Sequence, residues 1–153
     1  MELPDCLKLN SDIFEPKGIY KFPSELLSSP HPHYFIVVEI EGRLFHLVVC
    51  TTQFEKKKQY LAYAGIDECT LVWVKPAENN GLTQECYVNC NTVFSHYTTE
   101  DLQEKLTSGV LTYEGQISDS EYFQIMNGII QSPNVDKSVI LVIKKTFDDF
   151  NEL

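Results

Sequence analysis

Two histidines and two threonines occupy the positions in this chain that are best suited to chemistry. His31 and His33 stand at the start of an apolar stretch, and Thr51 and Thr52 follow the apolar stretch that returns beside it. Antiparallel pairing of two strands would bring these ends together. An imidazole titrates near neutrality and can give or take a proton, and a hydroxyl can donate a hydrogen bond to an anion. We therefore predict the active-site candidate at this end of the sheet.

The two histidines have more than one interpretation. Side chains two apart on a strand share a face, so the two rings could act together as acid and base. They could also be a solvated pair in a proline-rich loop, because Pro30 and Pro32 flank His31. A His-x-His metal site is a third interpretation, but no further ligand lies at a fixed spacing, so we predict no metal and no cofactor.

Other polar and aromatic residues could extend the site. The lysine run Lys56–Lys58 could bind phosphate or could be a solvated loop. Thr51 and Thr52 could contact phosphate or could cap a strand end. His96 follows a later predicted strand and is a candidate partner for His33. The aromatic residues could stack on nucleobases or pack in the core; they are Tyr34, Tyr60, Trp73, Tyr63 and Tyr87.

Strand-like segments dominate the first two thirds of the chain. The residues 41–43 form a strong hairpin signal between two β-branched and aromatic segments. Closely spaced strands of this kind are typical of a small barrel. We predict six strands, at residues 18–23, 34–40, 44–50, 60–65, 70–74 and 85–94.

Helical signals dominate the last third. Residues 98–106 begin with threonine and carry acids in the first turn, and Ser118–Glu121 is a capping box before an apolar stripe. Residues 134–150 fit either helix or strand, and we favour helix. The predicted class is α+β: one domain over residues 1–153, with an SH3-like barrel at about 17–97 and a helical part at about 98–150.

The charge and the cysteine content limit the possible classes of function. The net charge of −10 argues against a general attraction to nucleic acid. The five cysteines have no disulfide-framework spacing, and the first residues lack the basic and apolar regions of a signal peptide, so we expect a cytoplasmic protein. The apolar runs are too short to span a bilayer, so we expect no membrane contact.

Five short motifs occur in an order that resembles a known family. They are Gly18-Ile19-Tyr20, His31-Pro32-His33, Cys50-Thr51-Thr52, Cys86-Tyr87-Val88-Asn89-Cys90-Asn91 and Gly115-Gln116-Ile117-Ser118. Together they resemble the PemK/MazF-type toxins over about residues 17–131. Members of that family are SH3-like barrels with a C-terminal helix, commonly dimeric ribonucleases held silent by an antitoxin.

The resemblance implies a metal-independent endoribonuclease of a toxin–antitoxin system that cleaves single-stranded RNA. His33 would be acid or base, with His31 or His96 as its counterpart, while Thr52 and the lysine run would contact phosphate. Asn91 stands where some members have an aspartate, and Thr51 and Asn91 would contact RNA. The resemblance also implies a homodimer and an antitoxin partner.

One departure leaves a second hypothesis open. The arginine that the family usually places before the second strand is absent, and histidines stand there instead. The alternative is therefore a catalytically inactive SH3-like barrel that binds a protein or peptide.

Overall fold

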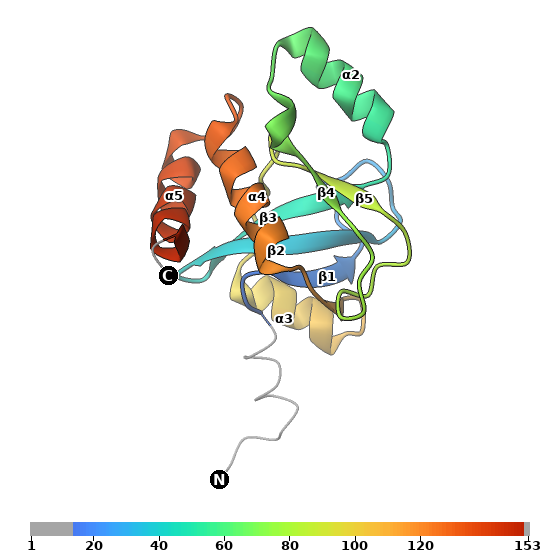
Figure 1. The fold of residues 1–153 in the computed structure, drawn as a ribbon. Coiled ribbons are helices and arrows are strands. Elements are labelled where there is room, and N and C mark those ends of the chain that lie inside the picture. The colour runs from blue at the N-terminus through green and yellow to red at the C-terminus, as the bar shows by residue number, and fades with distance from the viewer. Residues whose placement is uncertain (1–13, 152–153) are drawn as a thin grey trace.

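The computed structural model describes residues 14–151, which form a sheet flanked by helices (Figure 1). Within these residues, six strands make one antiparallel sheet in the order β4-β5-β3-β2-β1-β6. The predicted α+β class is confirmed, and two helices follow the last strand. The elements are β1 (Gly18–Phe22), β2 (His33–Glu41), β3 (Leu44–Thr51), α2 (Phe54–Ala64), the 3-10 turn η1 (Glu68–Thr70), β4 (Leu71–Val74), β5 (Cys86–Asn89), α3 (Thr99–Thr107), β6 (Thr112–Gln116), α4 (Asp119–Gln131) and α5 (Lys137–Asn151).

The sheet does not close into the predicted barrel. Strands β4 and β6 lie at its two edges and do not pair with each other. The loop after β4 runs beside β6 instead, and Gln116 N donates a hydrogen bond to Asn79 O at 3.1 Å. The turn-rich residues 75–81 form no strand. One backbone hydrogen bond therefore joins this loop to β6, whereas a closed barrel would have a continuous series of strand-to-strand hydrogen bonds there.

Two strand predictions are corrected. Residues 60–65, predicted as a strand, belong to α2, which ends at Gly65 with a left-handed φ of 71°. The lysine run, predicted in a loop, lies on the same helix. Lysine, glutamine and alanine are good helix formers, and glycine at this position is a common helix end. The sixth strand is β6, inside the part that was predicted to be helical.

Strand β5 is also shorter than the predicted 85–94. Its end at Asn89 has a local cause, because Asn89 Oδ1 accepts a hydrogen bond from Asn91 N at 3.1 Å. Such a side-chain bond replaces a ladder bond and turns the chain. The helix predictions are confirmed. Helices α3 and α4 begin at Thr98 and Ser118, each of which forms a capping box, and residues 137–151 form the helix α5, the alternative that we favoured.

Two apolar clusters fill the two faces of the sheet. One cluster packs Ile36, Val48 and Val88 under α4 and α5. The other packs Phe35 and Leu47 under α3. Strands β4 and β5 contribute residues only to the first cluster, and on their second face the start of α2 makes contact, where Phe54 stacks on Tyr87. The candidate site lies on this half of the second face.

The contact between the loop and β6 requires glycine. Gly115 has a φ of 144°, and a Cβ built on it would lie 2.1 Å from Asn79 O. We predict that Gly115→Ala lowers the free energy of unfolding by about 2–4 kcal/mol, since it adds both backbone strain and a clash with backbone. Urea unfolding of the purified variant measures this loss.

Gly109→Ala is the matched control for that experiment. Gly109 also has a positive φ, 80°, but nothing lies within 4 Å of its added Cβ. Its loss should be only about 1 kcal/mol, from backbone strain alone. Equal losses for the two variants would mean that the close approach at Gly115 does not restrict this position.

Candidate functional site

One row of side chains crosses four strands on this part of the sheet. Thr51 on β3 pairs with Tyr87 on β5, and Tyr87 pairs with Trp73 on β4. On the other side, β2 pairs with β3 up to Phe35 and Val49. His33 and Thr51 each lie two residues further along, so they share the face of that pair, and both line the same groove. Directly paired residues share a face of a sheet. The row therefore brings the predicted histidine and threonine together.

A groove of about 490 Å³ opens at the His33 end of this row. Serine and threonine hydroxyls, two side-chain amides, one imidazole and one ammonium group line it, over an apolar floor. None of its lining residues is acidic, in a chain that has 22 acidic residues and a net charge of −10. The lining residues are Leu27, Ser28, Ser29, Pro32, His33, Tyr34, Val49, Cys50, Thr51, Thr52, Gln53, Lys57, Asn89, Thr92 and Phe94.

His33 is the titratable ring in the groove. It is half-buried at the first position of β2, and its Nε2 atom is buried with no hydrogen-bond partner. Among side chains of residues 14–151, no other buried nitrogen or oxygen lacks a partner. A buried polar atom without a partner costs stability, so the position of this ring is not explained by its own hydrogen bonding.

The hydroxyls and one lysine lie beside His33. Thr51 Oγ1 accepts a hydrogen bond from Gln53 N at 3.1 Å, so this threonine also shapes the exit from β3. Thr52 is exposed, and Lys57 is half-buried on the first turns of α2. These side chains place one positive charge and several donors over one groove, an arrangement suited to a phosphate group.

Five of the predicted residues do not line the groove. His31 is exposed in the loop before β2, and Lys56 is exposed on α2; neither lines the groove. Lys58 faces a neighbouring pocket on the other side of the start of α2. His96 lines a third pocket, under α3.

The fifth, Asn91, is buried in a hydrogen-bond network. Its Nδ2 donates to Thr70 Oγ1 at 2.9 Å, and its Oδ1 accepts from Ser132 Oγ at 2.6 Å. These bonds tie the end of β5 to η1 and to the end of α4. Asn91 is 7% exposed as a residue, and its side-chain amide makes its hydrogen bonds with the protein itself.

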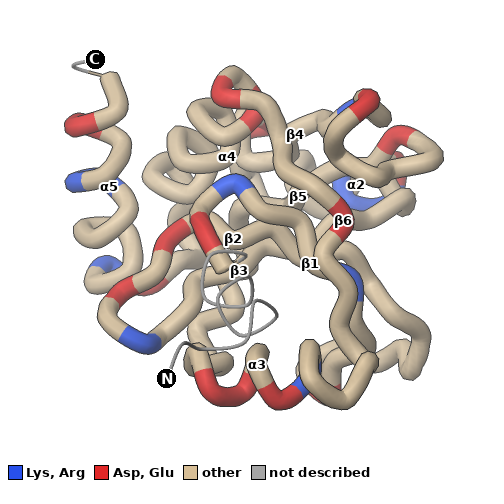
Figure 2. The backbone as a smooth tube through the Cα atoms, turned by 90° about the horizontal axis from the view of Figure 1, so that it is seen from below, with Lys and Arg blue, Asp and Glu red and all other residues tan. Residues whose placement is uncertain are grey.

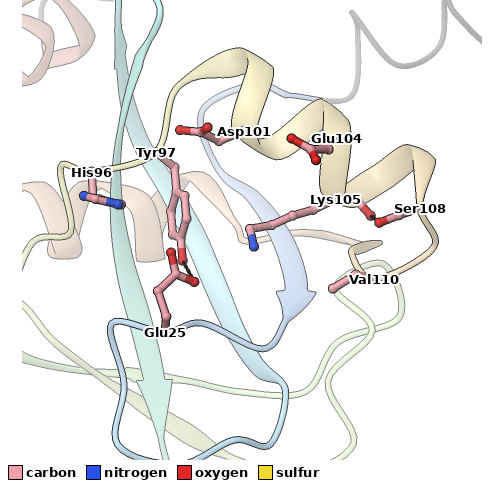
Figure 3. A pocket seen from close by; sticks show the side chains of 8 residues that line it. All are labelled: Glu25, His96, Tyr97, Asp101, Glu104, Lys105, Ser108 and Val110. Atoms are coloured by element: carbon pink, nitrogen blue, oxygen red, sulfur yellow. Dashed lines mark hydrogen bonds between the residues drawn. The ribbon is translucent and has the colours of Figure 1, made fainter.

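The pocket around His96 is acidic (Figure 3). The Tyr97 hydroxyl bonds Ser24 Oγ at 2.6 Å and donates to Glu25 Oε2 at 3.1 Å, and burial raises the pKa of Tyr97. Acidic residues of α3 border the pocket, as the red segments of that helix show (Figure 2). Three carboxylates beside one lysine would repel a phosphate, so the acid-free groove is the better candidate. The residues of this pocket are Glu25, His96, Tyr97, Asp101, Glu104, Lys105, Ser108 and Val110.

Sequence reasoning missed several lining residues. Ser28 and Ser29 come from the polar loop before β2, and Thr92 comes from the turn after β5. A signal existed for the serines, because they share a loop with His31 and precede the strand that carries His33. Nothing in the sequence marks Thr92, since only the turn at Asn89 brings it to the groove.

The site thus defines an α+β protein with a polar, acid-free groove on one face of the sheet. Comparison of the chain with models of known protein families finds no match, and comparison with curated proteins finds none either. Over the described residues, no helix is long and apolar enough to cross a membrane. The same residues gather no set of three histidine, cysteine or acidic side chains that could hold a metal ion.

The contacts of Asn91 predict a structural role. Asn91→Ala would leave the hydroxyls of Thr70 and Ser132 without this partner, so we expect the free energy of unfolding to fall by about 1–3 kcal/mol. This loss is measured by urea unfolding of the purified variant. A free energy of unfolding equal to that of the wild type would contradict the structural role.

Proposed function

We propose that the groove binds and cleaves single-stranded RNA without a metal ion. The observation that carries the proposal is the acid-free lining around His33 and Lys57 in a strongly acidic chain. A phosphodiester would be repelled from most of this protein's surface and accepted here. Carboxylates are the oxygen ligands that Mg²⁺ favours, and the groove offers none, which supports chemistry by side chains alone.

The proposed reaction uses the 2′-hydroxyl of the RNA as its nucleophile. Nε2 of His33 is covered by protein, so we assign the proton transfer to Nδ1. Nδ1 removes the 2′-hydroxyl proton while that oxygen bonds to phosphorus, and the bond from phosphorus to the 5′-oxygen breaks. Lys57 and the threonine hydroxyls stabilise the charge on the phosphoryl oxygens, and water protonates the leaving 5′-oxygen. The products are a 2′,3′-cyclic phosphate and a 5′-hydroxyl.

The resemblance to PemK/MazF-type toxins supplies the biological setting of the proposal. The enzyme would act in the cytoplasm as a homodimer, and an antitoxin protein would cover the groove. The four cysteines within residues 14–151 are free thiols, as a reducing compartment requires.

Binding without cleavage is the second candidate function. It is favoured by the positions of His31 and His96, which leave His33 as the one histidine in the groove. A groove with a single proton-transfer ring would still hold a polar ligand.

Cleavage by His33 is tested with purified protein and a mixed-sequence single-stranded RNA in EDTA. We expect cyclic-phosphate ends from the wild type and a rate lower by about 10²–10⁴-fold in His33→Ala, the usual contribution of a general base. His31→Ala is the matched control, because this ring is exposed two residues away; it should cleave at the wild-type rate. If folded wild-type protein gives no fragments, the nuclease proposal fails and binding alone remains.

The lysine run gives a second, independent test. Lys57→Ala should remove one phosphate contact and reduce the slope of log affinity against log salt by about 0.7, the value for one contact to a single strand. Lys56→Ala removes the same charge from the neighbouring, exposed position and should leave that slope nearly unchanged. Fluorescence anisotropy of a labelled RNA at several salt concentrations measures both. Equal slopes for the two variants would mean that Lys57 makes no phosphate contact.

A further inference from the structure

A second pocket, of about 290 Å³, continues the row of side chains beyond Thr51. Residues of the edge strand β4, of β5 and of the start of α2 line it. Three aromatic rings, one aliphatic side chain, one lysine and one glutamate line it, in contrast to the hydroxyls and amides of the groove. The lining residues are Phe54, Lys58, Glu68, Leu71, Trp73 and Tyr87. We call it the aromatic pocket.

The helix α2 is shared by both cavities. Gln53 and Lys57 line the polar groove, and the residues that directly follow them, Phe54 and Lys58, line the aromatic pocket. On the sheet below, Thr51 belongs to the groove, and its pairing partner on β5 belongs to the pocket. Thr51 and the outermost ring of the row are two strands apart, which is about 10 Å. One extended ligand could therefore occupy both cavities.

The aromatic rings are arranged as a platform. Phe54 stacks on Tyr87 with ring centroids 4.1 Å apart and planes inclined by 22°. Beside them, Trp73 is 42% exposed, a large value for a tryptophan, which usually buries most of its surface. Strand β4 is an edge strand of the sheet, and both Trp73 and the stacked pair line the pocket, so the partly exposed Trp73 is the ring that a ligand could reach.

Positive charge accompanies the platform. Lys75 Nζ lies 4.1 Å from the centroid of the Trp73 ring, and Lys58 Nζ lies 5.7 Å from that of Phe54. The one acid of the pocket, Glu68, is 4.0 Å from Lys58 and partly neutralises it. Aromatic faces flanked by ammonium groups are the usual means of binding unpaired nucleotides, with the base on a ring and the phosphate near a lysine.

We propose that the aromatic pocket stacks a nucleobase of the RNA strand whose phosphate lies in the polar groove. The inference rests on the proposed function, because the groove supplies the anchored phosphate, and it adds a base-binding subsite to it. Stacking accepts every base, so the subsite would strengthen binding with little preference for sequence.

The chain carries its own probe, because Trp73 is its one tryptophan. A short 2′-O-methyl oligonucleotide, which lacks the nucleophilic hydroxyl, should quench the tryptophan emission of the full-length protein on titration. An oligonucleotide of the same length made of abasic units keeps the phosphates and removes the bases. It should bind about tenfold more weakly, the loss expected for one stacked base, and should not quench.

Variants separate stacking from general surface effects. Trp73→Ala should bind the labelled 2′-O-methyl oligonucleotide about tenfold more weakly, and Trp73→Phe should recover most of the affinity. Tyr63→Ala is the matched control, since Tyr63 is an aromatic residue of α2 that is 93% exposed and lines neither cavity. It should bind like the wild type.

The outcomes distinguish this inference from the nuclease proposal. The subsite alone is overturned if the wild type cleaves RNA but is not quenched by the oligonucleotide, and if Trp73→Ala binds the oligonucleotide as tightly as the wild type does. Quenching of the wild type by the oligonucleotide, together with weaker binding by Trp73→Ala and no RNA cleavage by the wild type, supports the subsite and overturns the nuclease. Quenching by a proline-rich peptide but not by the oligonucleotide would assign the pocket to a peptide and overturn the inference.

Discussion

The junction between β3 and β5 holds the two parts of the sheet together, and the candidate site depends on it. Only two residue pairs make this junction, Cys50 with Val88 and Thr51 with Tyr87. Earlier along β3, the same edge is occupied by the segment at Phe94–Tyr97, which donates and accepts backbone bonds there. Strand β5 can therefore pair only with the end of β3, which places its polar and aromatic face next to Thr51.

This restriction explains why the site is open. Helix α3 covers the second face only over β1, β2 and the first part of β3, where the aromatic cluster around Phe35 is buried. Beyond Thr51 the chain leaves the sheet as α2, whose first turn touches the face through Phe54 and leaves cavities on both sides. Strand β5 is only four residues long, because the turn at Asn89–Asn91 ends it. It therefore adds little sheet surface beyond the end of β3.

The cavities differ in the charge of the residues that line them. The protein carries ten more acidic than basic groups, and α3 concentrates several of the acids around His96. The groove at His33 has no acidic lining residue, and Lys57 is its one lysine. The two consecutive lysines Lys57 and Lys58 diverge around the start of α2, and each cavity receives one of them. A helix makes this possible because consecutive side chains point about 100° apart.

Local sequence signals predicted the elements whose causes are local. The hairpin at Gly42, the capping boxes at Thr98 and Ser118 and the α+β class were predictable, since turns and caps act over three or four residues. The spacing of His33 and Thr51 also predicted their convergence, because one hairpin joins them. The strand prediction at 60–65 was wrong, because aromatic content outweighed the helix formers of α2.

The sequence by itself therefore determined the hairpin that carries His33, Thr51 and Thr52, and the helices at the end of the chain. Only the tertiary structure decided that β4 and β6 stay unpaired, that Lys57 joins His33 while His96 does not, and that Asn91 is buried. The physical reason is the distance along the chain over which each interaction acts. Periodicity and capping act between neighbours in the chain, whereas these outcomes depend on which segment competes for the edge of β3 and on where helices cover the sheet.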